Sequence, residues 1–211
     1  MEPLEWTEDG WFRIPEGVRA DQSIQKPYGQ AVTRSLNFHD FQSKNGGLGF
    51  AWSWYKPRSP IEYDVDHNTI SIIPNTYTVP IVFMPRDHAY EAQVEIEISG
   101  KASGRFVLFY NESTYSGLEL SDEGLHGIIR GWRTPAKPSP SRLLFVRLRY
   151  IDHEVIFYHS IDGTEWSKFE HSFETSGWHH NALGGFLALR LALWAQGSGK
   201  VTFKQFEYRS L

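Results

Sequence analysis

The sequence predicts an all-β sandwich. Its 211 residues fit one sandwich domain and are few for two ordinary domains. From residue 36 onward, short apolar and aromatic segments alternate with turn-forming clusters, and no amphipathic helix longer than about two turns stands out. Aromatic residues, which favour strands, are abundant, with 8 Trp, 10 Tyr and 14 Phe. These observations together favour two packed antiparallel sheets.

Residues 1–35 differ from the rest of the chain. They have mixed polarity, three prolines and no clear hydrophobic period. We therefore expect an extended connector over 1–35 that packs on a sandwich domain formed by 36–211. The apolar anchors of this connector would be Trp6, Trp11, Phe12 and Ile14.

The first half of the predicted sandwich contains one strongly amphipathic strand. Apolar and polar residues alternate without a break over 89–99, as in an antiparallel strand with one buried and one solvated face. The cluster at 99–104, with two glycines, predicts a turn after it. Further strands are predicted at 48–55, 69–74, 105–111, 115–120 and 125–132.

The second half contains a predicted hairpin, a tight turn and two closing strands. Segments 143–150 and 154–159 are expected to pair as a hairpin that turns at 151–153. The dipeptide Asp162-Gly163 predicts another tight turn, because glycine readily adopts positive φ. The apolar run 184–194 predicts a long strand that ends in a turn at 196–199, and 201–208 is the last strand.

Charge and composition exclude several classes of protein. The net charge of −4 does not suit a nucleic-acid partner, and we interpret Arg142, Arg147 and Arg149 as a solvated face. The absence of cysteine rules out disulfides and thiolate metal sites. No run of 18 apolar residues is present, so no membrane partner is expected. The N-terminus lacks the basic and apolar regions of a signal peptide, and the compartment stays open.

Glu95 and Glu97 form the sharpest enzyme hypothesis. Two residues apart on one strand, they share a face, and a retaining glycosidase needs two carboxylates close together. Sandwich-fold glucanases have a third acid in the same motif, whereas Ile98, Ser99 and Gly100 follow Glu97 here. The alternative is the solvated face of an amphipathic strand, which we favour. No nucleophile elbow, phosphate loop or dinucleotide fingerprint occurs in the sequence.

The segment Trp178-His179-His180-Asn181 is a candidate for binding or for an interface. Adjacent histidines on an extended chain point in opposite directions, so a shared metal ion is disfavoured. In the alternative, one histidine bonds locally and the other faces solvent. Stacking and hydrogen-bonding groups in one loop nevertheless suit a sugar or a neighbouring module.

Two further pairs have functional and structural interpretations. Asp64 and Asp66 could contribute to a structural Ca²⁺ site, but the full twelve-residue loop pattern is absent and a turn is favoured. Trp52 and Trp54 share one strand face and could form a sugar-stacking platform. Packing in the core or against another module is the favoured alternative. No other cofactor is expected.

Several segments resemble one family in their order and spacing. The segment 6–13 (WTEDGWFR) resembles the connector that leaves the catalytic propeller of glycoside hydrolase family 43 enzymes. The remaining segments resemble motifs of their C-terminal sandwich, with His159 inserted in the turn motif: 38–41 (FHDF), 48–57 (LGFAWSWYKP), 87–91 (DHAYE), 108–112 (LFYNE), 158–166 (YHSIDGTEW), 177–181 (GWHHN) and 185–190 (GFLALR). The resemblance covers nearly the whole chain.

This resemblance implies a concanavalin A-like jelly roll of two antiparallel sheets, attached to a five-bladed β-propeller. The enzymes it resembles are β-xylosidases and α-L-arabinofuranosidases that act on plant polysaccharide fragments. Their catalytic acids lie on the propeller, so no catalytic residue is carried over to this chain. In some relatives the sandwich supplies a loop to the rim of the active site, and 177–181 is our first candidate for it.

Three functions follow as hypotheses. The first is an accessory sandwich module that supports a catalytic propeller, its partner on the same full-length chain, and shapes the substrate pocket. The second is an independent carbohydrate-binding module for oligosaccharides, with Trp178 or the pair Trp52 and Trp54 as its platform. The third is a sandwich-fold glycosidase or lyase that uses Glu95 and Glu97.

Overall fold

The computed structural model describes residues 4–18, 40–185 and 187–211. The chain divides into two units, residues 1–34 and 35–211. In the described part of the first unit, β1 (Glu5–Trp6) and β2 (Phe12–Arg13) pair antiparallel as a short hairpin. Trp6 contacts Phe12 edge to face, and Trp6, Trp11 and Phe12 are all exposed. The predicted packing of 1–35 on the sandwich is not tested by this structure.

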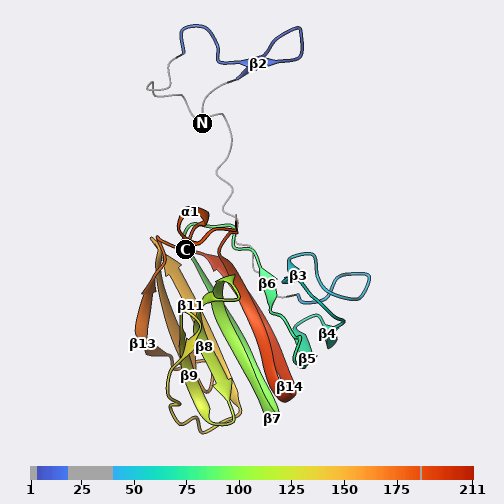
Figure 1. Ribbon diagram of the computed structural model, residues 1–211, viewed down its shortest axis with the longest axis vertical. Coiled ribbons are helices and arrows are strands. Elements are labelled where there is room, and N and C mark those ends of the chain that lie inside the picture. The colour runs from blue at the N-terminus through green and yellow to red at the C-terminus, as the bar shows by residue number, and fades with distance from the viewer. Residues whose placement is uncertain (1–3, 19–39, 186) are drawn as a thin grey trace. The chain divides into compact units, whose positions relative to one another are not determined.

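The second unit is a β-sandwich, as predicted, and Figure 1 labels most of its strands. Its elements in chain order are β3 (Trp52–Trp54), β4 (Glu62–Asp66), β5 (Thr69–Ile73), β6 (Ile81–Phe83), β7 (Tyr90–Asn111), β8 (Thr114–Ser121), β9 (Gly124–Ile129), β10 (Trp132–Arg133), β11 (Leu143–Ile151), β12 (Glu154–Ser160), β13 (Ser167–Glu174), α1 (His180–Leu183) and β14 (Arg190–Ser210). Within the described residues, no helix is long and apolar enough to cross a membrane.

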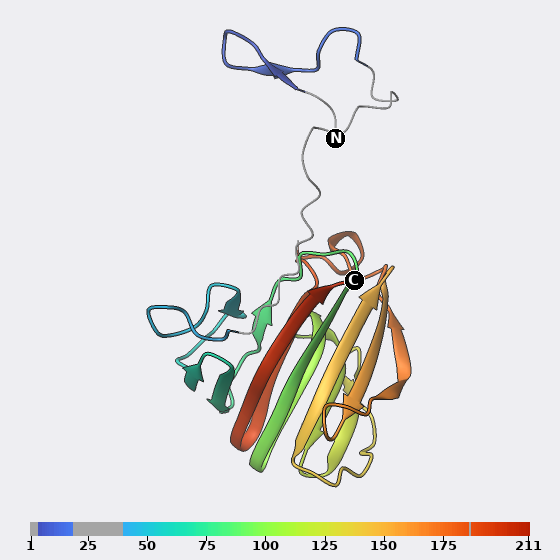
Figure 2. The ribbon, with the colours of Figure 1, turned by 180° about the vertical axis from the view of Figure 1, so that it is seen from behind.

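Two long strands, β7 and β14, belong to both sheets of the sandwich. They pair antiparallel along almost their whole length, from Arg190 opposite Phe109 to Ser210 opposite Tyr90, and lie side by side in Figures 1 and 2. The first half of β7 and the second half of β14 form sheet 1, in the order β4-β5-β14-β7-β11-β12-β13. Their other halves form sheet 2, in the order β3-β6-β14-β7-β8-β9-β10.

Glycines mark the place where both long strands pass from one sheet to the other. Gly100 lies opposite Gly199, and both have positive φ. A Cβ on Gly100 would lie 2.9 Å from the carbonyl oxygen of Ser198, and one on Gly197 would overlap the carbonyl oxygen of Lys101. Only glycine fits where two bent backbones approach this closely.

The turns predicted at 99–104 and 196–199 are therefore wrong. These residues lie inside continuous strands. Strand β7 joins the predicted segments 89–99 and 105–111. Strand β14 joins the end of the predicted segment 184–194 to 201–208. The composition was typical of a turn because a turn and a strand bend both need glycine at positive φ. Strand β14 also begins at Arg190, later than predicted, because α1 occupies His180–Leu183 and the described residues between it and Arg190 form no strand.

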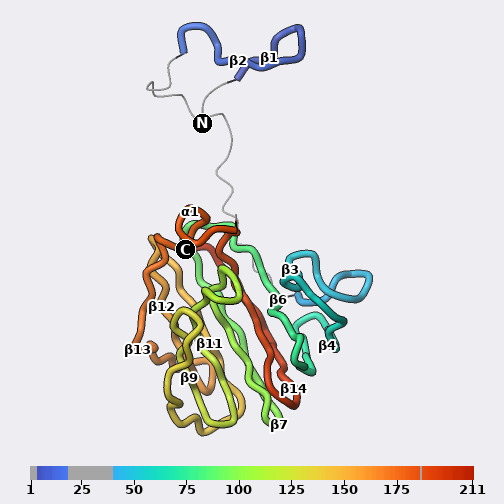
Figure 3. Tube along the Cα trace, viewed as in Figure 1, coloured from blue at the N-terminus to red at the C-terminus, as the bar shows by residue number. Residues whose placement is uncertain are grey.

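The other predicted hairpins are confirmed. β11 and β12 pair as expected and turn at Asp152 and His153, which both have positive φ. Gly163 has φ +76° in the turn between β12 and β13. Figure 3 shows β11, β12 and β13 following one another across sheet 1.

The main core lies between the two sheets. Alternate side chains of β7, from Tyr90 to Leu108, enter it together with residues of β11, β12 and β14. A second buried cluster covers part of the opposite face of sheet 2 and includes Phe109, Tyr115 and Trp194. Burial on both faces explains why the chain needs so many aromatic residues, since large rings fill the most apolar volume per residue.

Candidate functional sites on the sandwich

Glu95 and Glu97 share a face of β7, as predicted, and both pair with one lysine. Lys204 Nζ lies 3.0 Å from Glu95 Oε1 and 2.7 Å from Glu97 Oε2. The hydrogen bond to Glu97 and that to Glu95 raise the pKa of Lys204 above its ordinary value, which keeps the ammonium charged. This arrangement resembles the ion-paired outer face of a strand more than an acid and nucleophile facing a substrate.

The tryptophans of β3 pack inward or against neighbouring rings. Trp52 is 5% exposed, lies 4.8 Å from Phe41 between ring centroids, and donates from its indole nitrogen to the carbonyl oxygen of Asp40 at 3.2 Å. Trp54 is half-buried beside Tyr63, with ring centroids 5.3 Å apart. Neither ring lies open as a stacking platform.

The segment Trp178-His179-His180-Asn181 divides between core and surface. Trp178 is buried, at 6% exposure, while the other three residues are exposed. His179 and His180 have ring centroids 6.3 Å apart at an angle of 76°, and α1 begins at His180. His179, His180 and Asn181 therefore lie at the surface, whereas the indole ring of Trp178 does not.

A cleft of ≈ 340 Å³ opens at the same end of the sandwich. Thr175 links the wall of the cleft to the segment 178–181. The backbone N–H and the hydroxyl of Thr175 both donate to the carbonyl oxygen of His153, and Trp178 N donates to the carbonyl oxygen of Thr175. The residues that line it include Asp87, His88, Tyr90, Tyr150, Asp152 and His153. Neither histidine was selected as a site candidate from the sequence.

Aromatic rings and one carboxylate fix the floor of this end cleft. Tyr90 and Tyr150 stack with centroids 5.0 Å apart, and the Tyr150 hydroxyl lies 3.1 Å from His153 Nδ1. Tyr208 donates its hydroxyl proton to Asp87 Oδ2 at 2.8 Å. Burial, and then this bond to Asp87, raise the pKa of Tyr208 to about 12. The phenol therefore stays protonated and holds Asp87 in place.

The turn at the rim of the end cleft is built from unusual residues. Asp152 (φ 48°) and His153 (φ 68°) occupy a two-residue hairpin turn in which Asn-Gly is the favoured pair. Asp and His tolerate this region better than most residues, but glycine would adopt it with less strain. Polar side chains kept at this position suit a contact surface.

Asp64 and Asp66 are exposed on β4, which lies at the edge of sheet 1. In the described part of the chain, no group of three or more His, Cys, Asp or Glu is placed so that it could hold a metal ion. Asp66 Oδ1 instead accepts from the backbone of His67 at 2.7 Å. A strand and its turn, rather than a calcium loop, occupy this segment.

A buried charged network, not predicted from the sequence, lies on the outer face of sheet 2. The side chain of Glu119 is 2% exposed and pairs with Arg105 and with Arg133, whose Nε lies 2.9 Å away. His126 Nδ1 lies 2.8 Å from the Thr134 carbonyl oxygen, so it donates, and Nε2 accepts from Arg133 at 2.7 Å. The only signal in the sequence was a glutamate between two leucines of a strand.

Comparisons with known proteins show the fold. No family model matches the sequence, and no curated protein does. Among solved structures, the GH43 protein BlXynB from Bacillus licheniformis is 20% identical, with a TM-score of 0.71, and the match covers 100% of this chain and 46% of that one. This chain therefore shares its fold with part of that protein. A xylan β-1,4-xylosidase from Bacillus halodurans C-125 is 14% identical, with a TM-score of 0.70, and the match covers 98% of this chain and 46% of that one.

The chain thus spans just under half the length of each of these two solved proteins. The fold also resembles that of a lectin from Bauhinia forficata, in complex with GalNAc, at 9% identity and a TM-score of 0.50. That match covers 85% of this chain and 99% of the lectin. The sandwich therefore also occurs as nearly the whole of another protein.

Proposed function

We propose that this chain is an accessory β-sandwich module of a family 43 glycoside hydrolase that acts on xylan-type or arabinan-type fragments. In this role it supports a catalytic propeller and helps to shape the substrate pocket. The main support is that the chain matches along its whole length to less than half of each GH43 enzyme. The rest of such an enzyme would supply the catalytic carboxylates.

The hairpin of β1 and β2 is compatible with the proposal. Its rings Trp6 and Trp11 are 77% and 71% exposed on a two-stranded element, which is at best marginally stable alone. Aromatic rings on such a small element need a surface to pack on, which is either the sandwich or another module. The segment that resembles a propeller connector, 6–13, contains both rings.

The end cleft is the part of the sandwich we assign to the substrate pocket. It lies beside the exposed residues His179, His180 and Asn181, and its rim carries the strained turn at Asp152 and His153. Loops on a rigid scaffold commonly carry binding residues. This assignment extends the sequence-based candidate 177–181 to the neighbouring turn.

An assay of this chain on aryl xylosides and aryl arabinofuranosides tests the accessory role. We expect no turnover above background, because the proposed catalytic acids lie on another module. The variant carrying both Glu95→Gln and Glu97→Gln is the matched comparison and should behave as the parent does. Robust turnover that this variant abolishes would overturn the proposal in favour of a sandwich-fold glycosidase.

A second measurement tests the contribution to the pocket. In a protein that joins this chain to a propeller, replacement of His153 and His179 by alanine should raise KM for an oligosaccharide while leaving the thermal midpoint nearly unchanged. The replacement Lys168→Ala is the control, because Lys168 is an exposed residue of β13. An equal KM in the histidine variant and in the Lys168→Ala control would contradict a contribution of the end cleft to the substrate pocket.

A further inference from the structure

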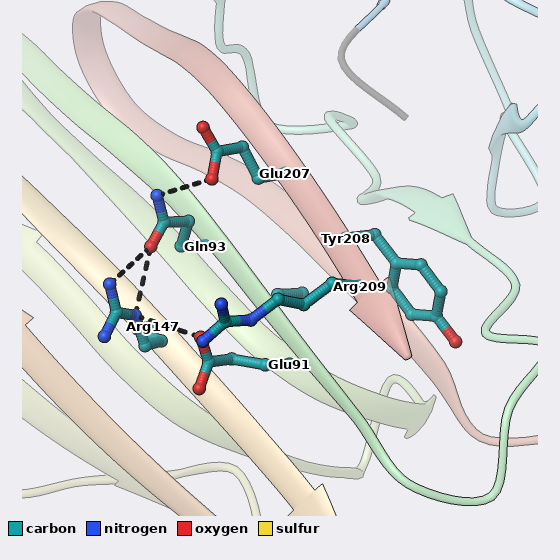
Figure 4. Close-up of a pocket in the computed structure, with 7 residues that line it drawn as sticks. Glu91, Gln93, Arg147, Glu207, Tyr208 and Arg209 are labelled. Atoms are coloured by element: carbon teal, nitrogen blue, oxygen red, sulfur yellow. Dashed lines mark hydrogen bonds and ion pairs between the residues drawn. The ribbon is translucent and has the colours of Figure 1, made fainter. Parts of the chain in front are cut away.

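A second cleft, of ≈ 260 Å³, lies on the solvent face of sheet 1 and shares no lining residue with the end cleft. Figure 4 shows the side chains that line it. Its polar lining comes from three neighbouring strands: Glu91 and Gln93 from β7, Arg147 from β11, and Glu207 and Arg209 from β14. Sequence analysis treated Arg147 as part of a solvated face and did not single out the others.

A β-bulge creates this lining. Lys204 lies opposite Glu95, yet Glu207 lies opposite Gln93, so β14 contains one extra residue between the two pairs. The extra residue is accommodated at Gln205, which has φ +50° and donates its backbone N–H to Asn68 O at 2.8 Å. Because side chains alternate along a strand, the bulge brings Glu207 and Arg209 to the solvent face. Without it they would point into the core.

The polar side chains are held in fixed positions by one another. Arg147 donates from Nε and Nη2 to Gln93 Oε1, at 3.0 and 2.8 Å, and Gln93 Nε2 donates to Glu207 Oε2 at 2.9 Å. Arg209 Nη2 donates to Glu91 Oε1 at 2.5 Å. The guanidinium carbon of Arg147 also lies 3.8 Å from the ring centre of Trp166. Figure 4 shows these side chains converging over β7.

Several hydrogen-bonding atoms of this network remain unused. Within the described residues, Glu91 Oε2 and Glu207 Oε1 accept no hydrogen bond, and Arg147 Nη1 donates none. These atoms remain accessible from solvent, although the side chains of Glu91 and Arg147 are only 12% and 24% exposed. A pre-positioned set of donors and acceptors is what a small polar ligand requires.

The charge of the cleft indicates the class of ligand. Two carboxylates and two guanidinium groups cancel, so neither an anion nor a cation is favoured. A hydroxyl group both donates and accepts, and therefore fits between a free carboxylate oxygen and a free guanidinium N–H. The volume lies just below the range of roughly 300–1,000 Å³ of small-molecule sites. A cleft of this volume suits one unit of a longer ligand chain.

We propose that this cleft binds one sugar unit of a neutral oligosaccharide through Glu91, Arg147 and Glu207. The site is separate from the end cleft and does not depend on the accessory role. Binding here would hold a polysaccharide chain against the module without any chemical step.

Titration of the whole chain with xylohexaose and arabinohexaose, followed by calorimetry and by backbone NMR shifts, tests the proposal. We expect saturable binding with shifts at β7 and the end of β14. The affinity should change little between low and high salt, because the ligand carries no charge. A galacturonic acid oligomer should bind no more tightly, because the two carboxylates and two guanidinium groups of the cleft cancel.

Matched variants assign the binding to the cleft. Glu207→Gln and Glu91→Gln should each weaken binding by at least about tenfold, as expected when a hydrogen bond to a charged group is lost. Glu170→Gln, which removes another ion-paired glutamate of sheet 1, should leave the affinity unchanged. Thermal midpoints and NMR spectra report whether each variant is folded.

Any one of the following results would overturn the proposal: no binding of either oligosaccharide, equal affinity in the Glu207 and Glu170 variants, or shifts confined to the end cleft. None of them bears on the accessory role, which is decided by the glycoside assays. Tighter binding of the charged oligomer that weakens in salt would likewise contradict a neutral ligand.

Discussion

At the residue scale, single side chains close turns and hold charges. Asp162 is the clearest case, because its Oδ1 accepts from the Ser160 hydroxyl and from the backbone N–H groups of Thr164 and Glu165, at 2.8–3.0 Å. Ser160 in turn accepts from Gly163 N at 2.9 Å. The bonds from Glu165 and Thr164 lower the pKa of Asp162 far below its usual range.

The turn should therefore depend on pH. A carboxyl group with a lowered pKa in the folded state stabilises that state above its ordinary pKa, and this contribution is lost as the pH falls through the lowered value. The parent should be more stable than Asp162→Asn at pH 7, and the difference should shrink below about pH 4. Urea unfolding of both proteins across this range measures it.

The control for this prediction is Asp64→Asn, on an exposed edge strand. Its difference from the parent should stay small throughout the same pH range. A constant difference between the parent and Asp162→Asn down to strongly acidic pH would show that the charge of Asp162 contributes nothing to the turn.

At the scale of the elements, β7 and β14 determine how the sandwich is built. Each strand belongs to both sheets, so a bend in β7 and a bend in β14 take the place of two hairpin turns between separate strands. The bends depend on Gly100, Gly197 and Gly199, all at positive φ and in close contact with the facing backbone. The bulge at Gln205 then sets which β14 side chains face solvent in sheet 1.

Replacement of a bend glycine should destabilise both sheets together. Gly197→Ala places a Cβ against the carbonyl oxygen of Lys101 at φ +84°, and strain of this kind costs about 1–3 kcal/mol or more. Gly177→Ala is the matched control, because no atom lies within 4 Å of its Cβ position. The free energy of unfolding in urea compares the two variants, and equal losses would contradict the role of the bend.

At the scale of the whole molecule, the buried apolar side chains among the described residues all come from one unit. Every member of the two described core clusters lies between Phe41 and Tyr208. The described hairpin of the first unit contributes none of them. An independent sandwich is consistent with the lectin match, in which a related fold forms nearly the whole protein.

The segment 36–211 should therefore fold without residues 1–35. We expect a cooperative thermal transition and a β-sheet circular dichroism spectrum for the shortened chain. Loss of the transition would contradict this prediction. A midpoint well below that of the whole chain would instead support the packing of 1–35 on the sandwich that the sequence suggests.

Much of the fold could be predicted from local pattern. The alternation in 89–99 predicted the solvated face that carries Glu91, Glu95 and Glu97, and Asp162-Gly163 predicted its turn. Composition could not distinguish a turn from a bend at Gly100 and Gly197, because both need the same backbone conformation. That distinction depends on which backbone lies opposite, about 100 residues away in the chain.

The sites divide in the same way. Local pattern predicted an all-β sandwich, placed Glu95 and Glu97 on one face, and marked residues 177–181 as a candidate for binding or for an interface. The burial of Trp178 and Trp52, and the meeting of Glu91, Arg147 and Glu207 over one cleft, became apparent only in the folded chain. Alternation fixes the face of a side chain within its own strand, whereas its neighbours depend on the register between strands and on a single extra residue at the bulge.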